Sequence, residues 1–283
     1  MTSFRILAGV ILACVSSGSM LLAQWPAYPD SKVPRTADGR PNFDAPTPRT
    51  PDGKPDLSGV WLNEWFYEGQ VRQPLVSPPG EPPASTFANI GAGFPDGLPF
   101  QPWAKELMPK RKEQNSKDNP DAHCLPMGLM QFHEHPQPRK MIQTPDVLVI
   151  PYEGNSGIRQ IFTDGRTSPR NDPQPWWYGY SAGHWEGDTL VVETTGLRDG
   201  GWLDIDGSPQ TDAAKITERF RRLNYGTMKI DVTIDDPKAY TAPFTVRVNQ
   251  KLMVDERMDA ELIEFICAEN EKDVEHMKIL GKK

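Results

Sequence analysis

Alternating apolar and polar residues in the second half of the chain predict two β-hairpins. The first joins residues 176–186 to residues 189–195 through a Gly-Asp pair at 187–188, which suits a tight hairpin turn. The second joins residues 215–222 to residues 228–235, where strict alternation places the apolar side chains on one face. Both hairpins therefore predict a sheet that covers a core.

Further runs of β-branched and aromatic residues lie on either side of these hairpins and are separated by turn residues. Eight to nine sequential strands with one apolar face predict an all-β fold, an antiparallel up-and-down β-barrel from about Lys140 to Cys267, since closure removes exposed sheet edges. The interior of such a barrel can hold one small ligand. The additional predicted strands are residues 140–144, 147–152, 158–163, 244–252 and 261–267.

The first part of the chain has a different composition. Residues 24–125 are dense in Pro and Gly, which predicts an extended segment that wraps the barrel, with a first strand near 57–62 and a short helix near 103–108 that Pro109 ends or kinks. A short repeat, 36–43 and 50–57, predicts two similar turns. The barrel and a short C-terminal tail then occupy residues 126–283.

Residues 1–23 have the composition of a secretory signal peptide. One basic residue, Arg5, precedes an apolar stretch, and small residues precede a cleavage point near Ala23. A membrane anchor is the alternative, but the apolar run is short for a span. Lipid attachment at Cys14 is a further alternative, although the apolar character continues past that residue. We therefore expect a periplasmic or secreted protein.

The net charge of the chain limits the kinds of molecule that it is expected to bind. The chain has 31 Lys and Arg against 38 Asp and Glu, a net charge of −7, and loss of Arg5 with the leader makes it about −8. This acidity argues against nucleic acid or anionic lipid as the main partner. No membrane span is predicted in the mature protein, and the oligomeric state is not predicted.

Two cysteines, Cys124 and Cys267, follow the leader. An exported chain usually oxidises such a pair. The bridge would close a loop of more than 100 residues and contribute about 4–5 kcal/mol by the chain-entropy estimate. Two buried free thiols are the alternative.

The strand pattern as a whole resembles the lipocalin-like (calycin-type) barrels. More narrowly, residues 183–192, 216–220 and 232–240 are similar to those of a family of uncharacterised secreted bacterial proteins, and the resemblance extends from Thr50 to Asp273. It implies a secreted β-barrel and carries no established chemistry. This chain has Gln210 where that family's usual pattern has His, which weakens any shared catalytic His in this loop.

The strand before the first turn carries the main candidate ligand site. Alternation places Tyr178, Tyr180, Ala182, His184 and Glu186 on one face. If that face points inward, its phenols, imidazole and carboxylate could bind an aromatic molecule and move a proton. In the alternative, Trp185 is the core residue and His184 is solvated. The predicted ligand-binding residues are Trp176, Trp177, Tyr178, Tyr180 and Glu186.

Glu218 interrupts the apolar face of the second hairpin. A carboxylate there is buried unless it is paired. It could have a raised pKa and act as a general acid or base, or it could pair with Arg159, Arg222 or Arg247.

The signals for a metal or cofactor are weak. His133 and His135 could supply half of a zinc site on a strand, but no further ligand motif completes it, and residues 202–207 lack the ligand spacing of a calcium loop. No phosphate-binding loop or nucleophile elbow is present. We therefore predict no metal and no cofactor.

Two functions remain. The first is a non-enzymatic binding protein, with Trp176, Trp177, Tyr178 and Tyr180 at the mouth or wall of a barrel that holds a small hydrophobic or aromatic molecule. The second is a cofactorless periplasmic enzyme, such as a lyase, isomerase or hydratase, with His184 and Glu218 as an acid–base pair. Carbohydrate stacking on the aromatic runs is a further alternative.

Overall fold

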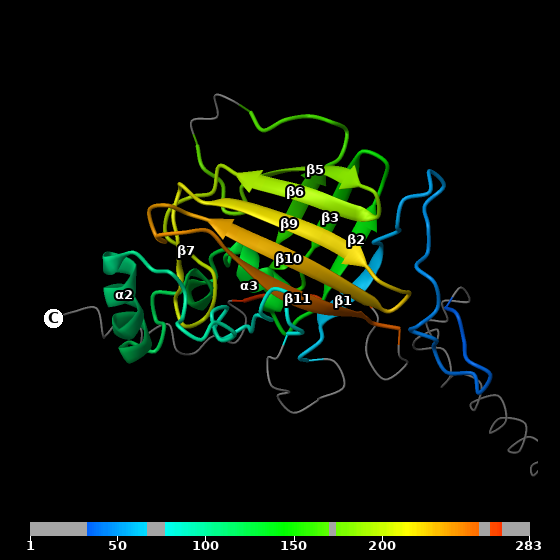
Figure 1. The fold of residues 1–283 in the computed structure, drawn as a ribbon, viewed down its shortest axis with the longest axis horizontal. Helices are drawn as coiled ribbons and strands as arrows, with labels where there is room; N and C mark the ends of the chain where they lie inside the picture. The colour runs from blue at the N-terminus through cyan, green and yellow to red at the C-terminus, as the bar shows by residue number, and fades with distance from the viewer. Residues whose placement is uncertain (1–32, 67–76, 170–173, 255–260, 268–283) are drawn as a thin grey trace, which may run out of the picture.

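The fold is a closed barrel of nine strands (Figure 1). The computed structural model describes residues 33–66, 77–169, 174–254 and 261–267. Each barrel strand pairs with its neighbours in chain order, and the last pairs with the first. The barrel strands are β1 (Gly59–Asn63), β2 (Arg139–Gln143), β3 (Val147–Pro151), β4 (Ile158–Phe162), β5 (Tyr180–Glu186), β6 (Thr189–Thr195), β9 (Lys215–Arg222), β10 (Thr227–Asp235) and β11 (Phe244–Leu252).

The predicted strand order is confirmed, but the sheet is not wholly antiparallel. β4 and β5 pair in parallel, with Ile161 opposite Ser181. A closed ring of antiparallel neighbours needs an even number of strands, so nine strands require a parallel pair. The chain between β4 and β5 provides the crossover that parallel strands need. The barrel is therefore mixed and largely antiparallel.

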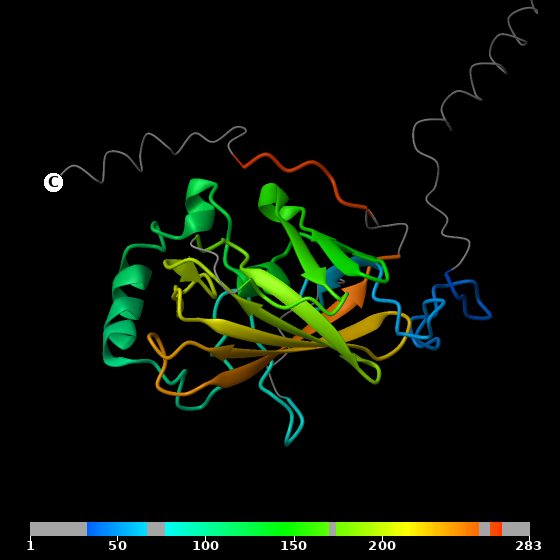
Figure 2. The ribbon, with the colours of Figure 1, turned by 90° about the horizontal axis from the view of Figure 1, so that it is seen from above.

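The two ends of the predicted barrel need correction. β1 lies between β11 and β2, so the strand predicted in the N-terminal segment is part of the barrel wall. The strand predicted at 261–267 is wrong, because β1 already fills the place beside β11 and leaves no edge for it. Residues 261–267 run outside the sheet (Figure 2).

The short helix is longer than predicted. α2 (Pro102–Glu113) contains Pro109 and continues for one more turn. Its last turn carries Lys110, Arg111 and Lys112, which favour the negative end of the helix dipole. Arg111 lies over the Trp202 ring at 4.1 Å and donates to the Gly207 carbonyl, so α2 is anchored at one end of the barrel.

Smaller elements complete the described chain. They are α3 (Leu129–Glu134), the 3₁₀ turns η2 (Pro120–His123) and η3 (Gly154–Ser156), and a two-stranded sheet of β7 (Gly201–Trp202) and β8 (Pro209–Gln210). α3 is buried along its whole length and packs on the inner barrel wall, where the Phe132 ring stacks on Tyr152 at 4.1 Å. This helix fills interior space that an open barrel would offer to a ligand.

The repeated sequence forms two equivalent turns. In each copy a Thr amide donates to the carbonyl four residues later, at 2.8 Å for Thr36 and 2.9 Å for Thr50. Arg49, immediately before the second copy, forms a bidentate ion pair with Asp188 in the β5–β6 turn at 2.6 Å. The predicted pair of turns is confirmed.

The disulfide between Cys124 and Cys267 is present, with a Cα–Cα distance of 5.6 Å. It fixes residues 261–267 outside the barrel, together with the Lys140–Glu261 ion pair at 2.6 Å. None of the described helices is both long and apolar enough to span a membrane. The predicted signal peptide, residues 1–23, lies outside the described residues.

Candidate functional site

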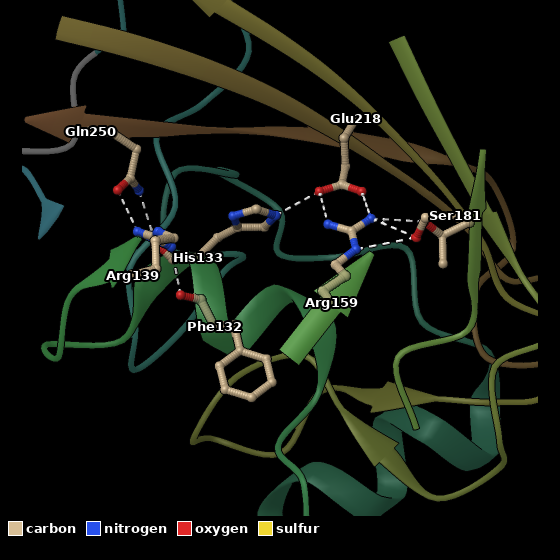
Figure 3. Close-up of polar contacts among 8 residues, drawn as sticks. Phe132, His133, Arg139, Arg159, Ser181, Glu218 and Gln250 are labelled. Carbon is tan, nitrogen blue, oxygen red and sulfur yellow. Dashed lines mark hydrogen bonds and ion pairs between the residues drawn. The ribbon is translucent and has the colours of Figure 1, made fainter. Parts of the chain in front are cut away.

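Glu218 is at the centre of a polar network inside the barrel (Figure 3). Alternation along β9 buries Ile216, Glu218 and Phe220 on the inner face. The Glu218 carboxylate accepts from Arg159 Nη1 at 2.9 Å, and its other oxygen accepts from Arg159 Nη2. Arg159 is one of the three arginines predicted from the sequence as ion-pair partners of Glu218.

Arg159 is held in place from two further strands. Its guanidinium donates to Ser181 Oγ on β5 at 3.0 Å and to Thr194 Oγ1 on β6 at 2.9 Å. Ser181 and Thr194 lie opposite each other in the sheet and their hydroxyls are 2.8 Å apart. The Glu218–Arg159 pair is therefore a satisfied buried ion pair, which is what burial of two charges requires.

His133, at the end of α3, is the second partner of Glu218. Its Nε2 lies 2.6 Å from Glu218 Oε1, while its Nδ1 is buried without a hydrogen-bond partner among the described residues. Burial lowers the pKa of His133, so the imidazole is neutral at pH 7. Because a carboxylate can only accept, Nε2 carries the proton and Nδ1 presents a lone pair.

The ionisation of Glu218 follows from these contacts. Burial alone would raise its pKa, but the charge and hydrogen bonds of Arg159 and the hydrogen bond of His133 outweigh burial and lower the pKa to about 2. Glu218 is thus ionised at neutral pH, and the raised pKa of a general acid is not found. This favours the ion-pair interpretation of Glu218.

The last carbonyls of α3, which have no partner within the helix, accept hydrogen bonds from the barrel wall. Arg139 on β2 donates to the carbonyls of Phe132 at 2.6 Å and His133 at 3.0 Å. Gln250 on β11 donates to the His133 carbonyl at 3.0 Å and accepts from Arg139. A helix end leaves its last carbonyls unpaired, and a cation there is favourable, so these contacts fix α3 inside the barrel.

Glu134 is a second buried carboxyl, at the last position of α3. Asn63 and Ser85 donate to its two oxygens. Burial raises its pKa to about 7, against the hydrogen bond of Ser85 and the charge of Arg139, which act to lower it. Glu134 therefore changes its charge near neutral pH.

Glu134→Gln is expected to remove one pH dependence of stability. A carboxyl whose pKa rises from 4.5 to about 7 on folding stabilises the protein fully below pH 4.5 and loses that contribution, roughly 3 kcal/mol, as the pH rises to 7. The free energy of unfolding of the variant should therefore rise by that amount, relative to the original protein, between pH 4.5 and 7.5. Urea unfolding at several pH values measures the difference in the free energy of unfolding between the variant and the original protein. The opposite contributions of His133 and His135 cancel in this difference, because both proteins contain these residues. A difference that is constant with pH would contradict the assignment.

His184 lies on the outer face of the barrel. Its side chain is 62% exposed and its Nε2 is 3.2 Å from Glu186 Oε1, while Arg219 pairs with the other oxygen of Glu186 at 2.8 Å. Glu218 faces the interior, so the structure does not bring His184 and Glu218 together. The predicted alternation from Tyr180 to Glu186 is present, but the face points outward, and the acid–base pair has no geometric support.

The predicted aromatic residues separate into two groups at Gly179. Gly179 has φ +63, in the left-handed region, and interrupts the alternation just before β5. Tyr178 therefore turns toward α3, where its ring lies 5.3 Å from Phe132. Tyr180 faces outward, 5.3 Å from the Phe162 ring and 6.0 Å from Trp176. We call Phe162, Trp176 and Tyr180, all half-buried, the outer aromatic cluster.

Cations lie beside this cluster. The Arg166 guanidinium is 4.1 Å from the centre of the Phe162 ring, and that of Arg198 is 4.4 Å from the Trp177 ring. No Arg or Lys of the described chain is stacked on Trp176 or Tyr180. Neither ring is therefore covered by a stacked cation, although Arg166 also bonds the Tyr180 side chain.

The residues considered for a metal are used in other contacts. His133 binds Glu218, and His135 packs edge-on against Phe87 at 5.0 Å. The Asp204 carboxylate accepts from the backbone amides of Ile90, Gly207 and Ser208. Within the described ranges, no group of three or more His, Cys, Asp or Glu is arranged to hold a metal ion.

Sequence reasoning missed the role of α3. Residues 129–134 were not assigned to a helix, so His133 was considered only as a metal ligand on a strand. The signal was the apolar residues Leu129, Met130 and Phe132, followed by His133 and Glu134, which need polar partners when the helix is buried. Gln210 is buried in β8.

Comparisons with protein family models, curated proteins and solved structures give no match for this chain. What the structure shows of the expected fold is a closed, mixed barrel of nine strands, and no family is identified.

Proposed function

We propose that this chain is an exported protein that binds a small aromatic molecule on the outer wall of its barrel. The observation that carries the proposal is the outer aromatic cluster, three half-buried rings that lie 5.3 and 6.0 Å apart on the face of the parallel β4–β5 pair. Grouped aromatic rings at a surface suit the stacking of another ring. The ligand stacks on Trp176 and Tyr180, whose faces are not covered by described cations.

The outer wall is favoured over the barrel interior because the inner positions are already filled. α3 packs there, and Glu218, Arg159 and His133 pair with one another. A molecule entering that space would displace charged groups that are satisfied only by each other. On the outer wall, binding needs no such rearrangement.

Replacing Trp176 and Tyr180 together with Ala is expected to weaken binding of p-cresol, an aromatic probe without a carboxyl group, by about tenfold, since each ring contact is worth about 0.5–1.5 kcal/mol. Isothermal titration calorimetry on the full chain measures the affinity. Trp103→Ala is the matched control, because Trp103 is a 46% exposed ring on α2, away from the cluster. Absence of p-cresol binding to the original protein, or equal loss in the control, would contradict the proposal.

A further inference from the structure

The turn that follows β4 places a guanidinium on the outer aromatic cluster. Arg166 lies 4.1 Å from the centre of the Phe162 ring and also bonds the Tyr180 side chain. Asp164 fixes it there, because its carboxylate accepts from Arg166 Nε at 2.9 Å and from Nη2 at 2.5 Å. The Arg166 side chain is 48% exposed, so the guanidinium remains accessible to a ligand that approaches from the solvent.

The polar atoms beside the rings are hydrogen-bond donors. A guanidinium can only donate, so the Tyr180 oxygen accepts from Arg166 and its own O–H remains to donate. The indole N–H of Trp176 is likewise only a donor. Neither the hydroxyl nor the indole N–H has an acceptor among the described residues, and neither is buried. A ligand on these rings therefore needs acceptor oxygens, and an ionised carboxylate is a group that only accepts.

Arg198 adds a positive charge beside the cluster that no acid balances. Its guanidinium lies 4.4 Å from the centre of the Trp177 ring and has no ion pair among the described residues. Its backbone amide donates to the Trp176 carbonyl at 2.9 Å, which holds this part of the chain beside Trp176. The next residue, Asp199, acts on Lys238.

The other charges near the cluster cancel in pairs. Arg166 is paired with Asp164, and Glu193, which is exposed on β6, is paired with Lys215 at 2.6 Å. Exposed charges are screened over about 8 Å at physiological ionic strength, so the net charge of −7 on the whole chain has little influence here. The unbalanced charge of Arg198 therefore makes the surroundings of the cluster favourable for an anion.

We propose that the ligand of the outer aromatic cluster is an aromatic carboxylate, whose ring stacks on Trp176 and whose carboxylate accepts from Arg166 and the Tyr180 hydroxyl. The inference rests on the proposed function and adds the chemical class of the ligand. Arginine suits this role because its planar guanidinium matches a carboxylate, and it has more N–H groups than Asp164 and Tyr180 use. Hydrogen bonds to an ionised group are about twice as strong as neutral ones.

The probes are 4-methylbenzoate and 4-methylbenzamide, which have nearly the same shape and differ in charge. Isothermal titration calorimetry of the full chain at pH 7 measures both affinities. We expect 4-methylbenzoate to bind about tenfold more tightly than the amide, because its hydrogen bonds are charge-assisted and it lacks an N–H group that would oppose the donors. The ratio of the two affinities should fall as NaCl is added, since the charges are exposed.

Arg166→Gln should lower this ratio to about twofold or less, because a neutral amide replaces the guanidinium. Arg40→Gln is the matched control. Asp38, Gly39 and Arg40 repeat the Asp-Gly-Arg sequence of the turn after β4, and Arg40 Nε donates to Asp38 at 2.6 Å, but no described aromatic ring lies under this guanidinium. Both arginines are exposed, so both variants should fold, and Arg40→Gln should keep the ratio of the original protein.

The outcomes separate this inference from the proposed function. Equal affinities for 4-methylbenzoate and 4-methylbenzamide, a ratio that is unchanged in Arg166→Gln, or a ratio that falls equally in Arg40→Gln would each overturn the inference. The proposed function would stand in all three cases, provided that p-cresol binds. If none of the three aromatic probes binds the original protein, both the inference and the proposed function are overturned.

Discussion

Glu218→Gln is expected to lower the free energy of unfolding by about 3–5 kcal/mol, which is the usual cost of leaving a buried charge without its partner. In the original protein Arg159 and His133 both bind the Glu218 carboxylate, and all three side chains are buried. A neutral amide cannot balance the guanidinium. For a domain of this size, the melting temperature should fall by roughly 10 °C.

Glu193→Gln is the matched control for this change. Glu193 is on β6 and pairs with Lys215 at 2.6 Å, but its side chain is 53% exposed, and such pairs contribute about 0–1 kcal/mol. Thermal unfolding measures the melting temperatures of both variants and of the original protein. If Glu218→Gln unfolds at the temperature of the original protein, the ion pair does not stabilise the barrel and a catalytic role for Glu218 becomes the better interpretation.

The same ion pair makes the stability of the protein depend on pH. The pKa of Glu218 falls from 4.5 in the unfolded chain to about 2 in the folded protein, so its contribution is complete above pH 4.5 and is lost as the pH falls toward 2. Glu218→Gln should lack this loss in acid.

Removing the disulfide is expected to have the second large effect on the free energy of unfolding. Cys124 and Cys267 are 143 residues apart in sequence, and the chain-entropy estimate for such a loop is about 5 kcal/mol. Changing both to Ser should lower the melting temperature by roughly 10 °C or more. It should also free residues 261–267, which are otherwise held by weak contacts such as Ile263 N to Glu153 Oε2 at 3.0 Å.

A reductant serves as the control for the disulfide. It should lower the melting temperature of the original protein to that of the Ser variant and leave the variant unchanged. Two titratable thiols in the unreduced, denatured protein, with no effect of reductant on unfolding, would show that the bridge does not form in solution.

The sequence predicted much of the barrel because alternation is a local signal. β9 and β10 follow from the period-two pattern, and the β5–β6 turn follows from Gly187, which has φ +59 at the first turn position. The closing partner of β11 is not local. Residues 59–63 and 261–267 are both apolar enough to form a strand, and only three-dimensional closure selects the former.

The site was predicted less well, because the direction of a face cannot be read from alternation alone. Tyr180 and His184 do share a face, as predicted, yet Ser181 and Gly183 are the residues that point inward. The inner face of β5 is polar and small because it must accommodate Arg159. That requirement arises from β4 and is not visible in residues 176–186.

The central claim is that aromatic ligands bind on the outer wall and not in the interior, and the tryptophans test it directly. Trp176 belongs to the outer aromatic cluster, whereas Trp61 and Trp202 are only 0% and 1% exposed. With ¹⁵N-labelled indoles, titration with p-cresol should shift the indole N–H signal of Trp176 and leave those of Trp61 and Trp202 in place. A shift of Trp61, which belongs to the barrel core, with none at Trp176 would place the ligand inside the barrel and contradict the claim.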